Sequence, residues 1–541
     1  MAQHSLLRTA VPDHSARRLF CPAIFTYTRL TRWPHSYRQL ARDRRVMERG
    51  ICKMNQMLEG MGALQHQRAV VVYTKDGVMV HVYETPRGAP KSSEQKYTFT
   101  DAWRLRLLLL KQINSIVRAA TDSKAEETET EPAVPASDPD SPDGVSHGAA
   151  LSNGAPPLSV AFPEKVKESR YILFLHGGAF ISQNPDFYRI FLNDLSRQTG
   201  ARVVAPRYRL APECPWPGQL QDALSFYRYL IEEEGIDPSS IVVAGDSAGG
   251  NLAVTLIMQL IQHNRTVGEG GIPIGLPRAL VLLSPWLDLT QSGPSYTLNR
   301  TAEPLLPLFS IEKAAALYRF GGGAFSMDLQ SNTLDKTPFR NPWVSPVFLS
   351  DRTVLRSFPP TCIHTGSVEV LLSDSLLFAR RLNAACRDAE VFDSPEPLLP
   401  LQIPEDCDTV GEGDIVTETA RRASRVSSLP SDFGSFASPE LLRSATTPNF
   451  VGNEPQAGPP LPSYFSDLGW LSEEAQNTLE KNGTVNATKT GDTEPNAVVI
   501  VWKDEFHVFP CFGFLEEPSA SECTRRIAEW INKQFGESPE A

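Results

Sequence analysis

Between residues 171 and 535 the chain alternates short, solidly apolar runs with longer stretches whose apolar residues recur at helical spacing. A short run without polar positions is typical of a strand buried on both faces. Strands are predicted at 171–175, 202–206, 241–245, 279–284, 361–366 and 497–502, and helices at 186–198, 218–233, 248–262, 374–386 and 520–535. The alternation predicts an α/β fold with a mostly parallel sheet and places ligand chemistry at the carboxyl ends of its strands.

Two further elements are predicted upstream of this alternation. Residues 69–85 form two β-rich runs around Lys75-Asp76-Gly77, and Asp-Gly is a strong signal for a tight hairpin turn. Residues 101–119 repeat apolar side chains at helical spacing. This helix either faces the core or a cap, or contacts a membrane surface, because Arg and Lys flank its apolar positions.

Charge is distributed unevenly along the 541 residues. Residues 1–50 carry a net charge of +7, residues 121–157 carry −7 and residues 393–495 carry −11, so the total of −11 leaves the remainder near neutral. A body without a basic stripe argues against nucleic acid as the main ligand. The chain contains no run of about 18 uncharged apolar residues, which predicts the absence of a transmembrane helix. Eight cysteines without a C-x-x-C pair favour neither a zinc site nor a disulfide scaffold and fit an intracellular setting.

Composition and pattern together predict the organisation of the chain. The segments are a basic N-terminal tail (1–50), a hairpin and cap helix region (51–120), a disordered acidic linker (121–157), the first part of the core (158–392) with a cap insertion near 290–345, a disordered acidic insert (393–495) and the C-terminal end of the core (496–541). We expect a cytoplasmic or peripherally membrane-associated protein, and the Arg-rich tail leaves a mitochondrial location open.

The strongest chemical signal is Gly245-Asp246-Ser247-Ala248-Gly249, which joins a predicted strand to a predicted helix. A G-x-S-x-G sequence in this context predicts a nucleophile elbow. The sharp turn exposes the serine Oγ, and the small neighbours let the strand and the helix pass close together. The helix N-terminus adds free N–H groups and positive potential. Ser247 is therefore the candidate nucleophile.

A second signal follows the strand 171–175, where the chain continues as His176-Gly177-Gly178-Ala179. Glycines allow a backbone to turn its N–H groups toward a developing oxyanion. Such donors lower a reaction barrier by about 3 kcal/mol each. This loop is the predicted source of oxyanion-hole donors.

Four motifs in this order, HGGA, YRLAPE, GDSAGG and SPWLDL, resemble the hormone-sensitive lipase family of α/β-hydrolases. That family includes esterases similar to fungal steryl acetyl hydrolase and arylacetamide deacetylase. The resemblance covers residues 171–392 and 496–535. It implies the α/β-hydrolase fold, with a mostly parallel central sheet, helices on both faces and a helical cap, and a triad in the order Ser, acid, His.

The resemblance assigns the other two members of the triad. The family's acid follows the strand 361–366 in an Asp-Pro-Leu sequence, and aligning Val-Leu of this chain on Pro-Leu places Glu369 there. Asp374 is the alternative acid, and its other role would be to cap the helix that begins nearby. His507 follows the last strand in His-Val-Phe, which resembles the family's His-Gly-Phe.

These assignments imply a serine carboxylic ester hydrolase that acts on a small or lipophilic ester through an acyl-enzyme, without a metal or organic cofactor. Two departures from the family pattern, Glu369 as the acid and Ala179 in place of a third glycine, leave a catalytically inactive, receptor-like protein as the alternative. The sequence predicts no oligomeric state. The expected triad is Ser247, Glu369 and His507, and the expected oxyanion hole consists of Gly177, Gly178, Ala179 and Ala248.

Overall fold

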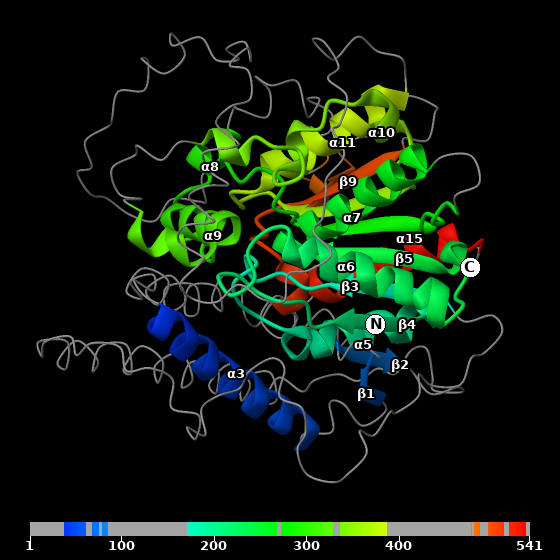
Figure 1. Ribbon diagram of the computed structural model, residues 1–541, viewed down its shortest axis with the longest axis horizontal. Helices are drawn as coiled ribbons and strands as arrows, with labels where there is room; N and C mark the ends of the chain where they lie inside the picture. Colours follow the sequence, from blue (N-terminus) through cyan, green and yellow to red (C-terminus); the bar gives the residue numbers. More distant parts are fainter. Residues whose placement is uncertain are drawn as a thin grey trace, which may run out of the picture.

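The computed structural model describes residues 37–60, 68–74, 78–84, 170–267, 272–327, 336–386, 478, 481–486, 496–512 and 519–536. Its strands form one nine-stranded sheet in the order β1-β2-β4-β3-β5-β6-β7-β9-β8 (Figure 1). The strands are β1 (Arg68–Tyr73), β2 (Met79–Glu84), β3 (Tyr171–Leu175), β4 (Arg202–Pro206), β5 (Ile241–Asp246), β6 (Ala279–Leu283), β7 (Thr361–Gly366), β8 (Thr484–Asn486) and β9 (Ala497–Trp502).

The six central strands, from β4 to β9 in this order, run parallel to one another. The alternation of apolar runs and helical stretches therefore predicted both the fold class and the positions of these strands correctly. The hairpin predicted at 69–85 is present as the antiparallel pair β1–β2. Its second strand pairs antiparallel with β4, so the hairpin extends the central sheet.

Helices cover both faces of the sheet, which is why central strands such as β3 and β6 consist of buried apolar residues. The α-helices are α3 (Tyr37–Gly60), α5 (Arg189–Thr199), α6 (Gly218–Arg228), α7 (Ser247–Thr266), α8 (Ser295–Leu298), α9 (Leu308–Phe320), α10 (Arg352–Arg356), α11 (Leu372–Cys386) and α15 (Ser519–Gln534). Helices α6, α7, α10 and α11 pack on one face, and α5 and α15 pack together on the other (Figure 1). Side chains along β3 alternate between the two faces. Leu173 and Leu175 pack into the core that includes α7, whereas Ile172 and Phe174 pack into the core that includes α5 and α15.

Helices α8 and α9 belong to the segment 290–345, for which the sequence predicts a cap insertion. They lie at the end of the sheet where the parallel strands terminate (Figure 1). Helix α9 contacts the loops there, because Trp216 N–H donates to Tyr318 O over 2.7 Å and the rings of Phe180 and Tyr318 stack. These helices therefore stand over the edge at which the candidate residues gather.

The prediction of a basic tail through residue 50 is wrong from Tyr37 onward, where α3 begins. One arginine of this segment, Arg44, has partners in the folded body. Arg44 Nε donates to Ile181 O over 2.6 Å, and its guanidinium also contacts Ala211 O and Glu213. Leu40 is buried on the same helix.

The prediction of a disordered insert over 393–495 is wrong at Thr484–Asn486, which forms β8 at the edge of the sheet. A β-branched pair of residues, Thr484 and Val485, extends the pairing of β9, and Lys503 N–H donates to Gly483 O over 2.8 Å. The predicted helix at 101–119 and linker at 121–157 lie outside the described residues. In the part of the chain that the structure describes, no helix is both long and apolar enough to cross a membrane.

The contacts of Arg44 predict that α3 stabilises the fold. Arg44→Met removes its hydrogen bonds to two buried backbone carbonyls, so we expect the free energy of unfolding to fall by about 2 kcal/mol. Urea denaturation measures this change. Arg45→Met, an exposed position of the same helix, is the matched control. An equal effect of both substitutions would contradict the anchoring role of Arg44.

Candidate active site

The candidate nucleophile lies at the junction of β5 and α7. Ser247 is the first residue of α7 and has a φ of +50°, a left-handed conformation that is uncommon for a residue other than glycine. The glycines on either side are required by close packing. A Cβ on Gly249 would lie 2.0 Å from Leu175 O, and one on Gly245 would lie 2.4 Å from Gly249 O. The local sequence therefore allows the strand, the helix and the end of β3 to meet at this turn.

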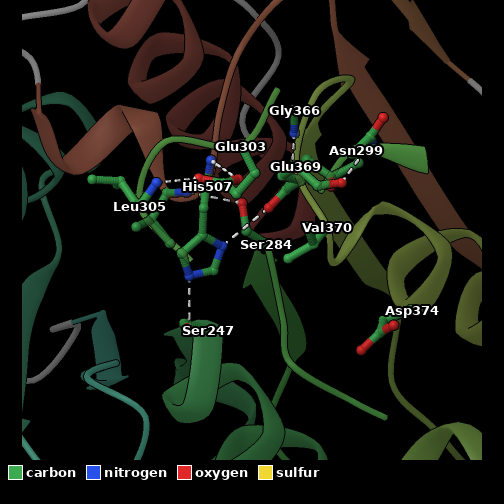
Figure 2. Close-up of polar contacts among 12 residues, drawn as sticks. Ser247, Ser284, Asn299, Glu303, Leu305, Gly366, Glu369, Val370, Asp374 and His507 are labelled. Carbon is green, nitrogen blue, oxygen red and sulfur yellow. Dashed lines mark hydrogen bonds and ion pairs between the residues drawn. The ribbon is translucent and has the colours of Figure 1, made fainter. Parts of the chain in front are cut away.

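Ser247, His507 and Glu369 form a continuous hydrogen-bonded chain (Figure 2). Ser247 Oγ lies 2.9 Å from His507 Nε2, and His507 Nδ1 lies 3.0 Å from Glu369 Oε2. All three side chains are buried. A proton on Nδ1 donates to the carboxylate and leaves Nε2 free to accept the hydroxyl proton, which is the arrangement that activates a serine.

Glu369 is held in place by the turn that follows β7. Its Oε1 accepts hydrogen bonds from Gly366 N–H over 2.5 Å and from the Thr365 hydroxyl. Its Oε2 remains directed at His507. Because one oxygen is bound to the turn and the other to the imidazole, the extra methylene of glutamate is accommodated without loss of reach.

Asp374, the alternative acid, lies apart from His507 (Figure 2). Its Oδ2 accepts the N–H groups of Leu287 and Asp288, each over 2.9 Å, and the Tyr296 hydroxyl over 3.0 Å. Burial, followed by the charge of Asp288, raises the pKa of Asp374 well above its usual value. Its carboxyl joins α11 to the segment after β6, so it neither reaches the imidazole nor caps its own helix.

The loop after β3 adopts a left-handed backbone at three successive residues. The φ angles are +106° at Gly178, +56° at Ala179 and +64° at Phe180. A Cβ on Gly178 would lie 2.1 Å from Ser182 O, so glycine is required there. Ala179 adopts the conformation that a third glycine would favour, at a cost of about 1–2 kcal/mol. The surrounding hydrogen bonds, including Ala211 N–H to Phe180 O over 2.9 Å, hold the loop in this form.

Gly177 differs from the other predicted oxyanion residues because its N–H is already engaged. It donates to Asp246 Oδ1 over 2.7 Å, and the Tyr188 hydroxyl donates to Asp246 Oδ2 over 2.9 Å. Among the described residues, no hydrogen bond is found from the N–H groups of Gly178, Ala179 or Ala248. Gly177 and Asp246 thus shape the loop, while the other three N–H groups remain free to bind an anion.

Asp246 is a functional neighbour that the sequence analysis did not single out, although it lies within the G-x-S-x-G sequence. Its carboxyl is fully buried beside Ser247, and this burial raises its pKa to about 7. The hydrogen bonds from Tyr188 and Gly177 oppose that shift without cancelling it.

Glu303 is a second neighbour without a sequence signal, because it lies 204 residues before His507. Its Oε2 accepts the backbone N–H of His507 over 3.2 Å and its Oε1 accepts that of Leu305 over 2.7 Å (Figure 2). Burial, together with the charge of Glu369, raises the pKa of Glu303 to about 8. Among the described residues, no group of three or more His, Cys, Asp or Glu side chains could hold a metal ion.

Aromatic side chains line the same end of the sheet. The rings of Phe180 and Tyr318 stack with centroids 3.7 Å apart, and Trp286 lies 6.2 Å from Phe180. The backbone N–H of Trp286 donates to Ser247 O over 2.9 Å, which joins the segment after β6 to the nucleophile turn. The loop after β3 is therefore packed through Phe180 into a buried aromatic cluster.

Comparison with known proteins gives a consistent result. Residues 172–396 match the sequence family described as having the alpha/beta hydrolase fold. The chain is 35% identical to an acetyl-hydrolase of Streptomyces hygroscopicus over 209 residues, which cover 39% of this chain and 60% of that protein. It is 32% identical to an esterase of Acinetobacter venetianus, covering 40% of this chain and 62% of that protein. It is also 32% identical to esterase LipU of Mycobacterium tuberculosis, covering 41% of this chain and 67% of that protein. The chain thus spans about 60% of the length of the first two of these relatives.

The raised pKa of Asp246 predicts a dependence of stability on pH. An aspartate in an unfolded chain titrates near about 3.9, so between that pH and about 7 the folded state retains a proton that the unfolded state releases. Raising the pH through this window therefore favours unfolding. We expect the stability of Asp246→Asn relative to wild type to increase by on the order of 4 kcal/mol from pH 4 to pH 8.

Urea denaturation of both proteins across this pH range measures that difference. The Asp246→Asn amide can still accept from Gly177 and interact with Tyr188, so the pH slope isolates the ionisation of one carboxyl. Parallel stability curves for the two proteins would contradict the prediction.

Proposed function

Because the chain belongs to a family with the α/β-hydrolase fold, we propose that it is a serine carboxylic ester hydrolase that works through an acyl-enzyme. The observation that carries the proposal is the hydrogen-bonded chain from Ser247 through His507 to Glu369. The two departures from the family pattern, at Glu369 and Ala179, do not interrupt this series of hydrogen bonds.

In the proposed reaction, Ser247 Oγ attacks the carbonyl carbon of the ester while His507 Nε2 takes the hydroxyl proton. Glu369 keeps the proton on Nδ1 and stabilises the imidazolium that forms. The imidazolium then protonates the leaving alcohol, which departs and leaves an acyl group on Ser247. A water molecule, deprotonated by the same imidazole, hydrolyses the acyl-enzyme and restores the serine.

The negative charge on the carbonyl oxygen is stabilised by N–H groups from two elements. We assign this role to Gly178 and Ala179 from the loop after β3, and to Ala248 from the first turn of α7. The proposal is supported by the absence of other acceptors for these groups among the described residues. Each such donor contributes about 3 kcal/mol to lowering the barrier.

We propose an apolar ester with a short acyl chain as the substrate class. The proposal is supported by the place of two large aromatic residues in the chain. Phe180 directly follows Ala179, and the backbone N–H of Trp286 donates to Ser247 O. Peripheral contact with a membrane and an intracellular location are further proposals that rest on the sequence alone.

The proposal is tested by measuring hydrolysis of p-nitrophenyl acetate, butyrate and decanoate. We expect turnover to fall from acetate to decanoate, and Ser247→Ala to lower kcat/KM by at least about 10³-fold. Ser239→Ala, at an exposed serine before β5, is the matched control and should leave turnover unchanged. A folded wild type that hydrolyses no ester would instead favour the receptor-like alternative.

The identity of the acid is tested by two isosteric substitutions. Glu369→Gln removes the carboxylate from His507 and should lower kcat by about 10³- to 10⁴-fold, as the loss of the orienting carboxylate does in serine hydrolases. Asp374→Asn, at a carboxyl that does not reach the imidazole, should have a far smaller effect. The reverse order of the two effects would assign the acid to Asp374.

A further inference from the structure

One turn of the chain after α8 contacts both the acid and the base of the site. The turn is Asn299–Glu303, closed by Glu303 N–H donating to Asn299 O over 2.9 Å. Its first and last side chains are both buried. It belongs to the segment predicted as the cap, so it joins the cap to the residues that carry the chemistry.

Asn299 binds the loop that carries the acid. Its Nδ2 donates to Glu369 O over 2.8 Å and to Ser367 O over 3.1 Å (Figure 2). A single amide group thus satisfies two backbone carbonyls of the turn after β7. These contacts fix the backbone of Glu369, whereas Thr365 and Gly366 fix its carboxyl.

Glu303 binds the loop that carries the base. Its two oxygens accept backbone N–H groups on different sides, that of His507 over 3.2 Å and that of Leu305 over 2.7 Å. The neighbouring N–H of Val508 donates to Ser284 Oγ over 3.1 Å. The backbone N–H groups of His507 and Val508 are therefore both held by side chains from elsewhere in the fold.

This loop needs external support because its backbone is strained. Asp504 and Val508 flank His507 at φ angles of +58° and +47°. A left-handed conformation is a genuine outlier for a β-branched residue such as valine, and strain of this kind persists only where surrounding contacts determine it. A loop with these angles relaxes when such contacts are removed, and the imidazole moves with it.

We propose that the Asn299–Glu303 turn is a positioning element that sets the relative placement of Glu369 and His507 for catalysis. The inference rests on the proposed function, since it concerns the efficiency of the same triad. Both side chains bond to backbone groups of the loops that carry the acid and the base, so their proposed role is positioning. Displacing the imidazole by a fraction of an ångström breaks the alignment of both its nitrogens, and misplacement by about 1 Å lowers a rate by about 100-fold.

The two substitutions that test this inference preserve side-chain size. Glu303→Gln replaces one acceptor oxygen by an NH₂ group, which then faces either the N–H of His507 or that of Leu305. Asn299→Asp replaces the donor by an acceptor that faces two carbonyls. We expect each to lower kcat by about 10- to 100-fold and to change KM by less than about twofold. A turn that served the fold alone would not produce this division between kcat and KM.

The matched control is Glu312→Gln, which removes a carboxylate from α9 at a position paired with Lys336. It should leave kcat unchanged. All rates are expressed per folded molecule, with the folded fraction taken from circular dichroism. If Glu303→Gln is too unstable to assay, Glu303→Asp keeps the carboxyl but shortens its reach by one methylene, and the same loss in kcat is expected.

The outcomes separate this inference from the proposed function. Labelling with a fluorophosphonate reports whether Ser247 is activated at all. A wild type that neither turns over an ester nor reacts with the reagent contradicts the proposed function and this inference with it. An active wild type whose Glu303 and Asn299 variants keep wild-type kcat per folded molecule overturns this inference alone, as does an equal loss in Glu312→Gln.

Discussion

The close approach of the β5–α7 turn to the end of β3 is the constraint on which the site depends. Gly249 lies where a Cβ would be 2.0 Å from Leu175 O and 2.4 Å from His176 O. This contact places the serine and the oxyanion loop side by side before any side chain is considered. The pairing of Leu175 with Gly245 in neighbouring strands gives the same alignment from within the sheet. A larger residue at the crossing would separate the two halves of the site.

Backbone strain occurs in three segments of the site. Ser247, Ala179 and Val508 have φ angles of +50°, +56° and +47°, and they belong to the nucleophile turn, the oxyanion loop and the base loop respectively. Each left-handed residue costs about 1–2 kcal/mol. Tertiary hydrogen bonds maintain these conformations, among them that of Val508 N–H to Ser284 Oγ. The stability of the body is thus used to hold the reacting groups in conformations that the isolated loops would leave.

Three buried carboxyls surround the triad without belonging to it, and burial raises the pKa of each. Asp246 holds the oxyanion loop through Gly177, Asp374 holds the segment after β6, and Glu303 holds the base loop. Each accepts backbone N–H groups, which is a positioning role. Glu369 is the carboxyl that contacts the imidazole. The environment therefore assigns different tasks to chemically similar groups.

The central strands, the elbow at Ser247 and the glycine-rich loop after β3 could be predicted from the sequence alone, because each depends on neighbours in the chain. Apolar runs predict buried strands, and the glycines around Ser247 and at Gly178 indicate places where two backbone segments pass close together. The identity of the acid and the supporting contacts of the site depend on residues that are distant in the sequence. Which of Glu369 and Asp374 reaches His507 depends on hydrogen bonds across 138 residues, and the role of Glu303 depends on one across 204. Likewise α3 is held by the contact of Arg44 with Ile181, 137 residues away, and β8 by its pairing with the edge of β9. Such contacts leave no periodic or local pattern, so only the folded chain reveals them.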